Sequence, residues 1–115
     1  MNTIYHNPNW SKSRKSVEIL KNEGIDFKTI MYLKNPPTKN EIIKICSKLQ
    51  CKPRDIIRKN EKDFKENNLN EILDNDDLLL SKMIQFPKII ERPIIIINNQ
   101  AVIGKPPENI YKIIK

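Results

Sequence analysis

Apolar and polar positions along the chain predict short strands separated by helices. Residues 3–5 combine β-branched and aromatic side chains, which are typical of a strand. Residues 11–22 then follow a helical pattern, and Gly24 is placed to end that helix. Residues 27–33 predict a second strand before the turn signal at residues 35–37. A strand, a helix and a strand in this order favour two parallel strands.

The middle of the chain is predicted to be helical. Residues 38–41 (Thr-Lys-Asn-Glu) form a capping-box pattern. The apolar positions behind it follow helical spacing: Ile42, Ile45, Cys46 and Leu49. Residues 53–58 predict a short helix that starts at a proline. A further helix is expected to begin at Asp74 or Asn75 and to end near Phe86.

The C-terminal part of the chain predicts a β-hairpin and a last helix. Four consecutive isoleucines at residues 94–97 indicate a strand that is buried on both faces. Asn98-Asn99 is a turn signal, and residues 101–103 form the returning strand. A last helix starts near Pro106. The sequence therefore predicts the α/β class: a mixed four-stranded sheet with a helical insertion between the second and third strands.

Length and composition limit the organisation and the compartment. The 115 residues fit a single domain, residues 1–115, in which the helical subdomain spans about 38–88. No apolar run exceeds that of residues 94–97, so no membrane-spanning helix is expected. The N-terminus resembles no secretory signal, and we expect a cytoplasmic protein. The net charge of +7 would attract nucleic acid, but without an aromatic-interleaved basic motif a solvated basic face is favoured.

Cysteine and histidine are scarce. One His and two Cys, scattered along the chain, do not make a structural zinc site, so we expect no metal. Cys46 and Cys51 are five residues apart, which is not a C-x-x-C redox motif. On one continuous helix this spacing would place them on different faces. Both are interpreted as small buried or half-buried apolar residues.

Five segments resemble the glutaredoxin-coupled arsenate reductase (ArsC) family. The first, residues 6–14 (His-Asn-Pro-Asn-Trp-Ser-Lys-Ser-Arg), is similar to the family's active-site signature. The other similar segments are residues 32–38, 57–61, 90–94 and 101–108, in family order and at compatible spacing. Each match is weak alone, but together they span nearly the whole chain. On this resemblance the chain is identified as a member of the ArsC branch, which also contains the Spx-like proteins.

The resemblance implies a thioredoxin-like fold and a known activity. Members of the family reduce arsenate to arsenite, with glutathione and glutaredoxin as co-substrates and no bound cofactor. A cysteine at the start of the first helix attacks arsenate, and a cluster of cations holds the oxyanion. Carried onto this chain, the anion-binding residues would be Ser11, Lys12, Ser13, Arg14, Arg58, Arg92 and Lys105. His6 would lie near the nucleophile, and Pro93 would form a cis-proline turn.

The main departure from the family pattern is Trp10, which stands at the position of the nucleophilic cysteine. An indole can neither bond arsenic nor exchange with a thiol, because its ring nitrogen is only a hydrogen-bond donor. Trp10 could fill the vacated pocket, present a ring that stacks on a ligand or partner, or be an incidental exposed aromatic, and Lys12 or Arg14 could stack on it. Lys105 replaces a third arginine and lacks its planar fork. A nucleophile relocated to Cys46 or Cys51 is the less favoured alternative.

Several functions remain open from the sequence. One is an oxidoreductase of the arsenate reductase type, and another is a pseudoenzyme that binds a small oxyanion or a thiol. The third is an Spx-like regulator that binds a protein. Glutaredoxin or another protein is a candidate partner, whereas nucleic acid and membrane are not expected. Arg58 and Arg92 could hold an anion or pair with carboxylates such as Asp55 and Glu91.

Overall fold

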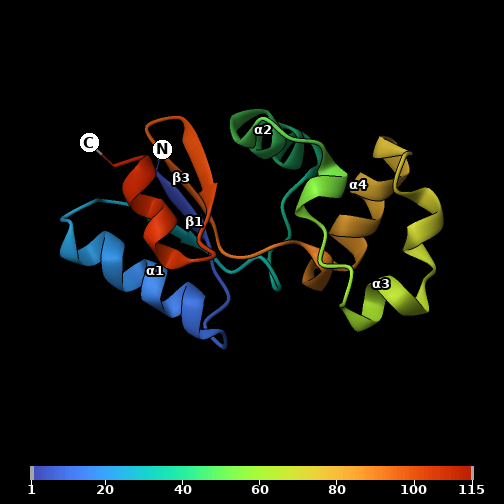
Figure 1. Cartoon of the computed structure of the whole chain (residues 1–115), viewed down its shortest axis with the longest axis horizontal. Helices are drawn as coiled ribbons and strands as arrows, with labels where there is room; N and C mark the ends of the chain where they lie inside the picture. Colours follow the sequence, from blue (N-terminus) through green and yellow to red (C-terminus); the bar gives the residue numbers. More distant parts are fainter. Residues whose placement is uncertain (1, 115) are drawn as a thin grey trace. The chain divides into compact units, whose positions relative to one another are not determined.

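The computed structural model describes residues 2–114 (Figure 1). Met1 and Lys115, the end residues of the predicted domain, lie outside the described residues. The chain divides into two compact units. The sheet unit contains the residues up to Asn35 and those from Arg92 onward, and the helical unit is Pro36–Glu91. Among residues 2–114 no helix is long and apolar enough to cross a membrane.

The sheet unit contains the predicted mixed four-stranded sheet. Its strands are β1 (Thr3–Tyr5), β2 (Lys28–Ile30), β3 (Ile94–Ile97) and β4 (Gln100–Ile103), in the order β2-β1-β3-β4. Strand β1 is parallel to β2 and antiparallel to β3, and β3 pairs antiparallel with β4. The predicted second strand is shorter than expected, because the amides of Lys34 and Asn35 both bond the Met31 carbonyl and turn the chain.

Two helical segments pack together in the sheet unit. They are α1 (Ser11–Asn22) and η4 (Pro107–Lys112), the latter a 3-10 helix (Figure 1). One core cluster joins them to the sheet, with members Ile4, Ile19, Leu20, Ile95, Ile97, Ile110 and Ile113. Gly24 has φ 68° after the end of α1, as its predicted role requires. Helix α1 is therefore packed on the sheet through Ile19 and Leu20.

The β3–β4 hairpin follows the sequence prediction closely. Asn98 and Asn99 have φ 52° and 65°, the positive values of a two-residue primed turn. Residues 94, 95 and 97 are buried and residue 96 is half-buried, as expected for a central strand.

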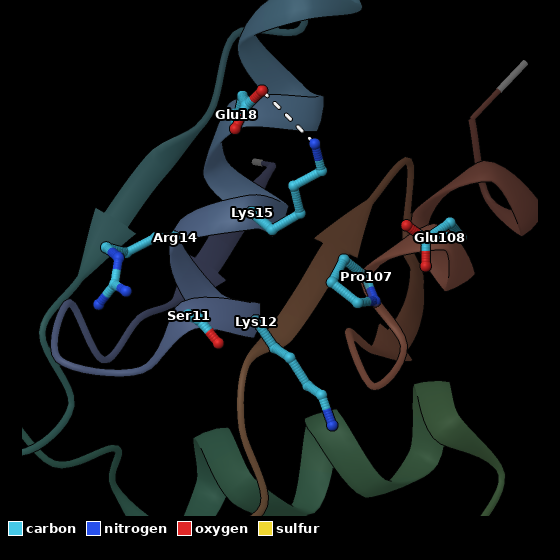
Figure 2. Close-up of a pocket in the computed structure, with 7 residues that line it drawn as sticks. All are labelled: Ser11, Lys12, Arg14, Lys15, Glu18, Pro107 and Glu108. Atoms are coloured by element: carbon cyan, nitrogen blue, oxygen red, sulfur yellow. Dashed lines mark ion pairs between the residues drawn. The ribbon is translucent and has the colours of Figure 1, made fainter.

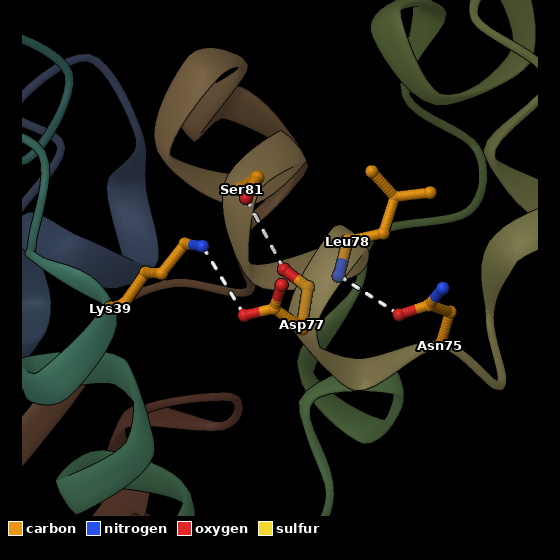
Figure 3. Close-up of polar contacts among 5 residues, drawn as sticks. All are labelled: Lys39, Asn75, Asp77, Leu78 and Ser81. Atoms are coloured by element: carbon orange, nitrogen blue, oxygen red, sulfur yellow. Dashed lines mark hydrogen bonds and ion pairs between the residues drawn. The ribbon is translucent and has the colours of Figure 1, made fainter.

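The helical unit consists of α2 (Lys39–Leu49), α3 (Lys62–Glu66), α4 (Asp76–Gln85) and the short 3-10 helices η1 (Pro53–Ile56), η2 (Leu69–Ile72) and η3 (Pro87–Ile89). The predicted capping box is confirmed, because Thr38 Oγ1 accepts from the Glu41 amide and Glu41 Oε1 accepts from the Thr38 amide. Asn75 caps α4 by accepting from the Leu78 amide (Figure 3). Lys39 Nζ, 3.3 Å from Asp77 Oδ1, links α2 to α4 (Figure 3).

The placement of the two cysteines differs from the sequence expectation. Helix α2 ends before Cys51, because Gln50 adopts a left-handed conformation with φ 58°. The Cys51 amide then donates to the Cys46 carbonyl at 3.0 Å, and both side chains line the same pocket. The spacing argument for different faces therefore does not apply, since it held only for a continuous helix. Their predicted burial is confirmed: Cys46 is buried and Cys51 half-buried.

Candidate anion-binding site

The loop between β1 and α1 presents an uncapped helix N-terminus. Asn7 shapes the loop, since its Oδ1 accepts from the Asn9 amide and its carbonyl accepts from the Trp10 amide. Trp10 is the N-cap residue of α1, with an extended backbone and no side-chain capping bond. The first helical turn contains no acidic residue. The free amides and the helix dipole therefore favour an anion at this end.

Ser13 and His6 hold the loop from its inner side. Ser13 is 0% exposed, and its Oγ accepts from the Asn7 amide at 3.0 Å and lies 2.6 Å from His6 Nδ1. Burial, and then the charge of Arg14, lower the pKa of His6. The neutral imidazole can accept a hydrogen bond from the Ser13 hydroxyl at Nδ1. Ser13 and His6 are thus bonded to each other within the loop. Ser13 is not among the residues that line the pocket at the start of α1, which is described below.

Trp10 is half-buried and lies against two cations. The Arg92 Cζ atom is 4.1 Å from the ring centroid, and Lys12 Nζ is 5.4 Å from it. Lys12 was expected in this role, but Arg14 instead donates to the Pro8 carbonyl at 2.9 Å. Arg92 precedes Pro93 through a cis peptide bond, as the family resemblance implied. The sheet unit therefore places an aromatic ring beside two positive charges at the start of α1.

A pocket of about 450 Å³ opens beside this helix end (Figure 2). It is lined by Ser11, Lys12, Arg14, Lys15 and Glu18 of α1, and by Pro107 and Glu108 of η4. Lys15 was not among the predicted site residues, although its helical spacing from Ser11 and Lys12 places it on their face. Glu18 Oε1 is 3.5 Å from Lys15 Nζ, so Lys15 pairs with a carboxylate, whereas Lys12 and Arg14 line the pocket from the start of α1.

The remaining predicted cations do not line this pocket. Lys105 is exposed, and Arg92 stacks on the Trp10 ring. Arg58 belongs to the helical unit, where its Nη1 lies 2.8 Å from Glu61 Oε2 and 2.9 Å from the Lys88 carbonyl. Arg58 therefore shows the carboxylate pairing that the sequence left open, with Glu61 as the partner.

The mixed sheet, the loop at the start of α1 and the cis proline before β3 define a thioredoxin-like protein. The chain belongs to the ArsC family, whose family model matches residues 5–113. An arsenate reductase of Neisseria meningitidis is 38% identical over 113 residues, which cover 96% of each chain. An Escherichia coli arsenate reductase is 35% identical over 97% of this chain and 79% of its own length. The structure of a Vibrio cholerae arsenate reductase matches with TM-score 0.93 and 39% identity, over 98% of this chain and 97% of that one.

Proposed function

We propose that this chain is an ArsC-family protein that binds a small oxyanion at the start of α1 and does not reduce arsenate there. The observation that carries the proposal is Trp10, whose indole stands before α1 with Arg92 and Lys12 against its ring. Arsenate reduction through a thiol adduct requires a thiolate that can bond arsenic and then exchange with a second thiol. The loop from His6 to Arg14 contains no thiol.

The two cysteines elsewhere are poor replacements for a nucleophile. Both belong to the helical unit, and burial raises the pKa of Cys46 to about 12 and also raises that of Cys51. Reactive cysteines have lowered pKa values, because the thiolate is the attacking species. At neutral pH Cys46 and Cys51 are therefore held as thiols, which supports the assignment of a binding function rather than a relocated reductase.

Binding can persist without the reaction. Charge-assisted hydrogen bonds from Lys12 and Arg14 would contribute about 1.5–3 kcal/mol each. The helix end would add about 0.3–1 kcal/mol. These terms total about 3–7 kcal/mol before the cost of immobilising the ligand, so only weak binding, in the millimolar range or weaker, is expected. A thiol that carries carboxylates, such as glutathione, offers the same cations a negative group.

The catalytic half of the proposal is tested by arsenate-dependent NADPH oxidation with glutathione, glutaredoxin and glutathione reductase. The natural protein and Trp10→Cys are assayed side by side, with a reaction lacking arsenate as the blank. We expect no arsenate-dependent turnover from the natural protein. Turnover by the natural protein would overturn the proposal. Turnover by Trp10→Cys alone would show that the remaining groups still support the family chemistry.

The binding half is tested by titrating arsenate, phosphate and sulfate while the fluorescence of Trp10, the single tryptophan, is followed. Lys12→Ala and Arg14→Ala should each weaken binding about tenfold, the equivalent of about 1.4 kcal/mol. Lys21→Ala is the matched control, since Lys21 lies in the last turn of the same helix and is exposed. Absence of binding, or equal losses in Lys21→Ala and Lys12→Ala, would contradict the proposal.

A further inference from the structure

The helical unit holds two thiols in a fixed pair that the proposed function does not use. The left-handed Gln50 turns the chain back at the end of α2, and the Cys51 amide donates to the Cys46 carbonyl at 3.0 Å. The two side chains are also close enough to interact with each other. The backbone turn therefore brings the two cysteines together before any ligand binds.

Both sulfur-bearing side chains open onto one pocket of about 490 Å³. Its wall includes the apolar side chains of Ile43, Pro53 and Leu80, together with Ser47. Cys46 is only 4% exposed, whereas Cys51 is half-buried. A reagent that enters the pocket thus meets Cys51 first and Cys46 behind it.

The protonation state of the pair selects among ligands. Desolvation is the main cause that raises the pKa of both thiols, and the Asp55 carboxylate adds to it in each case. A divalent cation requires deprotonated thiolates, so its binding would release both protons at a cost. Among residues 2–114 there is also no cluster of three or more side chains that could hold a metal ion. Disulfide formation also starts from a thiolate, so the raised pKa values of both thiols slow it as well.

We propose that Cys46 and Cys51 form a dithiol site that chelates a trivalent arsenical. With arsenous acid, each thiol replaces one hydroxyl group on arsenic. Two sulfur–arsenic bonds form, two arsenic–oxygen bonds break, and the two thiol protons leave in two molecules of water. No electron is transferred, and arsenic remains trivalent. Cys51 forms the first bond and Cys46 closes the chelate.

The pocket suits the remaining substituent on arsenic. After chelation the third position keeps a hydroxyl group in arsenous acid or an organic group in an organoarsenical. The apolar wall formed by Ile43, Pro53 and Leu80 can bury an organic group, which would add hydrophobic stabilisation. This inference is independent of the proposed function, because all of its residues lie in the helical unit and none in the loop of Trp10.

The test uses the full chain, kept reduced with a phosphine, and phenylarsine oxide as the probe. We expect one probe per chain by intact mass spectrometry, with loss of one water molecule and of both titratable thiols. The chelate should resist excess glutathione and be released by a small dithiol such as dimercaptopropanol. A second arm with inorganic arsenite should protect Cys51, the more exposed thiol, from a maleimide.

Cys51→Ala and Cys46→Ala separate chelation from single-thiol capture. Each should bind the probe on the order of 10²-fold more weakly, because the second bond is no longer intramolecular. Ser47→Ala is the matched control in the same pocket and should bind like the natural protein. Because Cys51 is only half-buried, Cys51→Ala should fold even if Cys46→Ala does not, and it then carries the test alone. Equal affinity of Cys51→Ala and the natural protein, release of the probe by glutathione, or tighter binding of zinc than of arsenite would each overturn the proposal.

Discussion

Gly104 offers a quantitative test of how the sheet unit is packed. It is buried after β4, and its amide donates to the Pro93 carbonyl at 2.9 Å. A Cβ atom added there would stand 2.6 Å from Ser16 Oγ, 2.8 Å from Pro93 Cγ and 2.9 Å from Ile95 Cδ1. All three distances are shorter than ordinary van der Waals contact, so Gly104→Ala requires the neighbours to shift.

The expected magnitude follows from how little those neighbours can move. Ser16 and Ile95 are each 0% exposed, and the Pro93 ring is rigid. Overpacking of this kind costs about 1–3 kcal/mol. The reduced freedom of the unfolded chain offsets about 0.4–1 kcal/mol. We therefore expect Gly104→Ala to lower the free energy of unfolding by about 1–2 kcal/mol.

The assay is urea unfolding followed by far-UV circular dichroism and by Trp10 fluorescence, and a lower midpoint with an unchanged slope is expected. Adding Ser16→Ala removes the nearest clashing atom, so the double variant should be more stable than additivity predicts by about 0.5–1 kcal/mol. Gly24→Ala is the control, because φ 68° strains its backbone while nothing lies within 4 Å. Strict additivity of Gly104→Ala with Ser16→Ala would refute the packing argument.

Three further predictions concern other parts of the chain. Thr38→Ala removes the acceptor of the Glu41 amide and should cost about 1 kcal/mol by urea unfolding, whereas Thr38→Ser should restore most of it; equal stability of the two variants would contradict this. An NMR titration should give His6 a pKa below its usual 6.5, and this pKa should rise partly in Arg14→Ala. Between that lowered pKa and 6.5 the unfolded chain binds the proton more tightly, so stability should fall on acidification through this window. Since the pKa of Cys46 is raised to about 12, its alkylation by iodoacetamide should be slow at neutral pH and accelerate into the alkaline range; rapid neutral labelling of folded protein would count against this.

Local signals in the sequence determined most of the fold. The Thr38 capping box, the Asn98-Asn99 turn and the run Ile94–Ile97 each specify an element through interactions within a few residues. These interactions depend on backbone geometry and short side-chain reach, which the sequence contains. The extent of the second strand was less predictable, because the hydrogen bonds to the Met31 carbonyl decide where β2 ends.

The residues at the start of α1 were predictable as a group but not in their individual contacts. The motif pointed to Ser11, Lys12 and Arg14, and the structure places all three around one pocket. Sequence reasoning could not show that Arg92, far along the chain, lies on the Trp10 ring. It also could not show that Ser13 turns inward to His6, because such contacts depend on how β1 and α1 pack.

The cysteine pair shows most clearly what the sequence determined and what only the tertiary structure decided. The sequence alone predicted that Cys46 and Cys51 are small, at least partly buried residues, and this is confirmed. Their contact depends on Gln50, whose left-handed backbone ends α2 one residue before Cys51. A helical spacing rule assumes that the helix continues. Gln50 is neither glycine nor proline, so the sequence did not indicate that the helix would end there. Chemistry that needs two side chains together was therefore decided by where the chain turns.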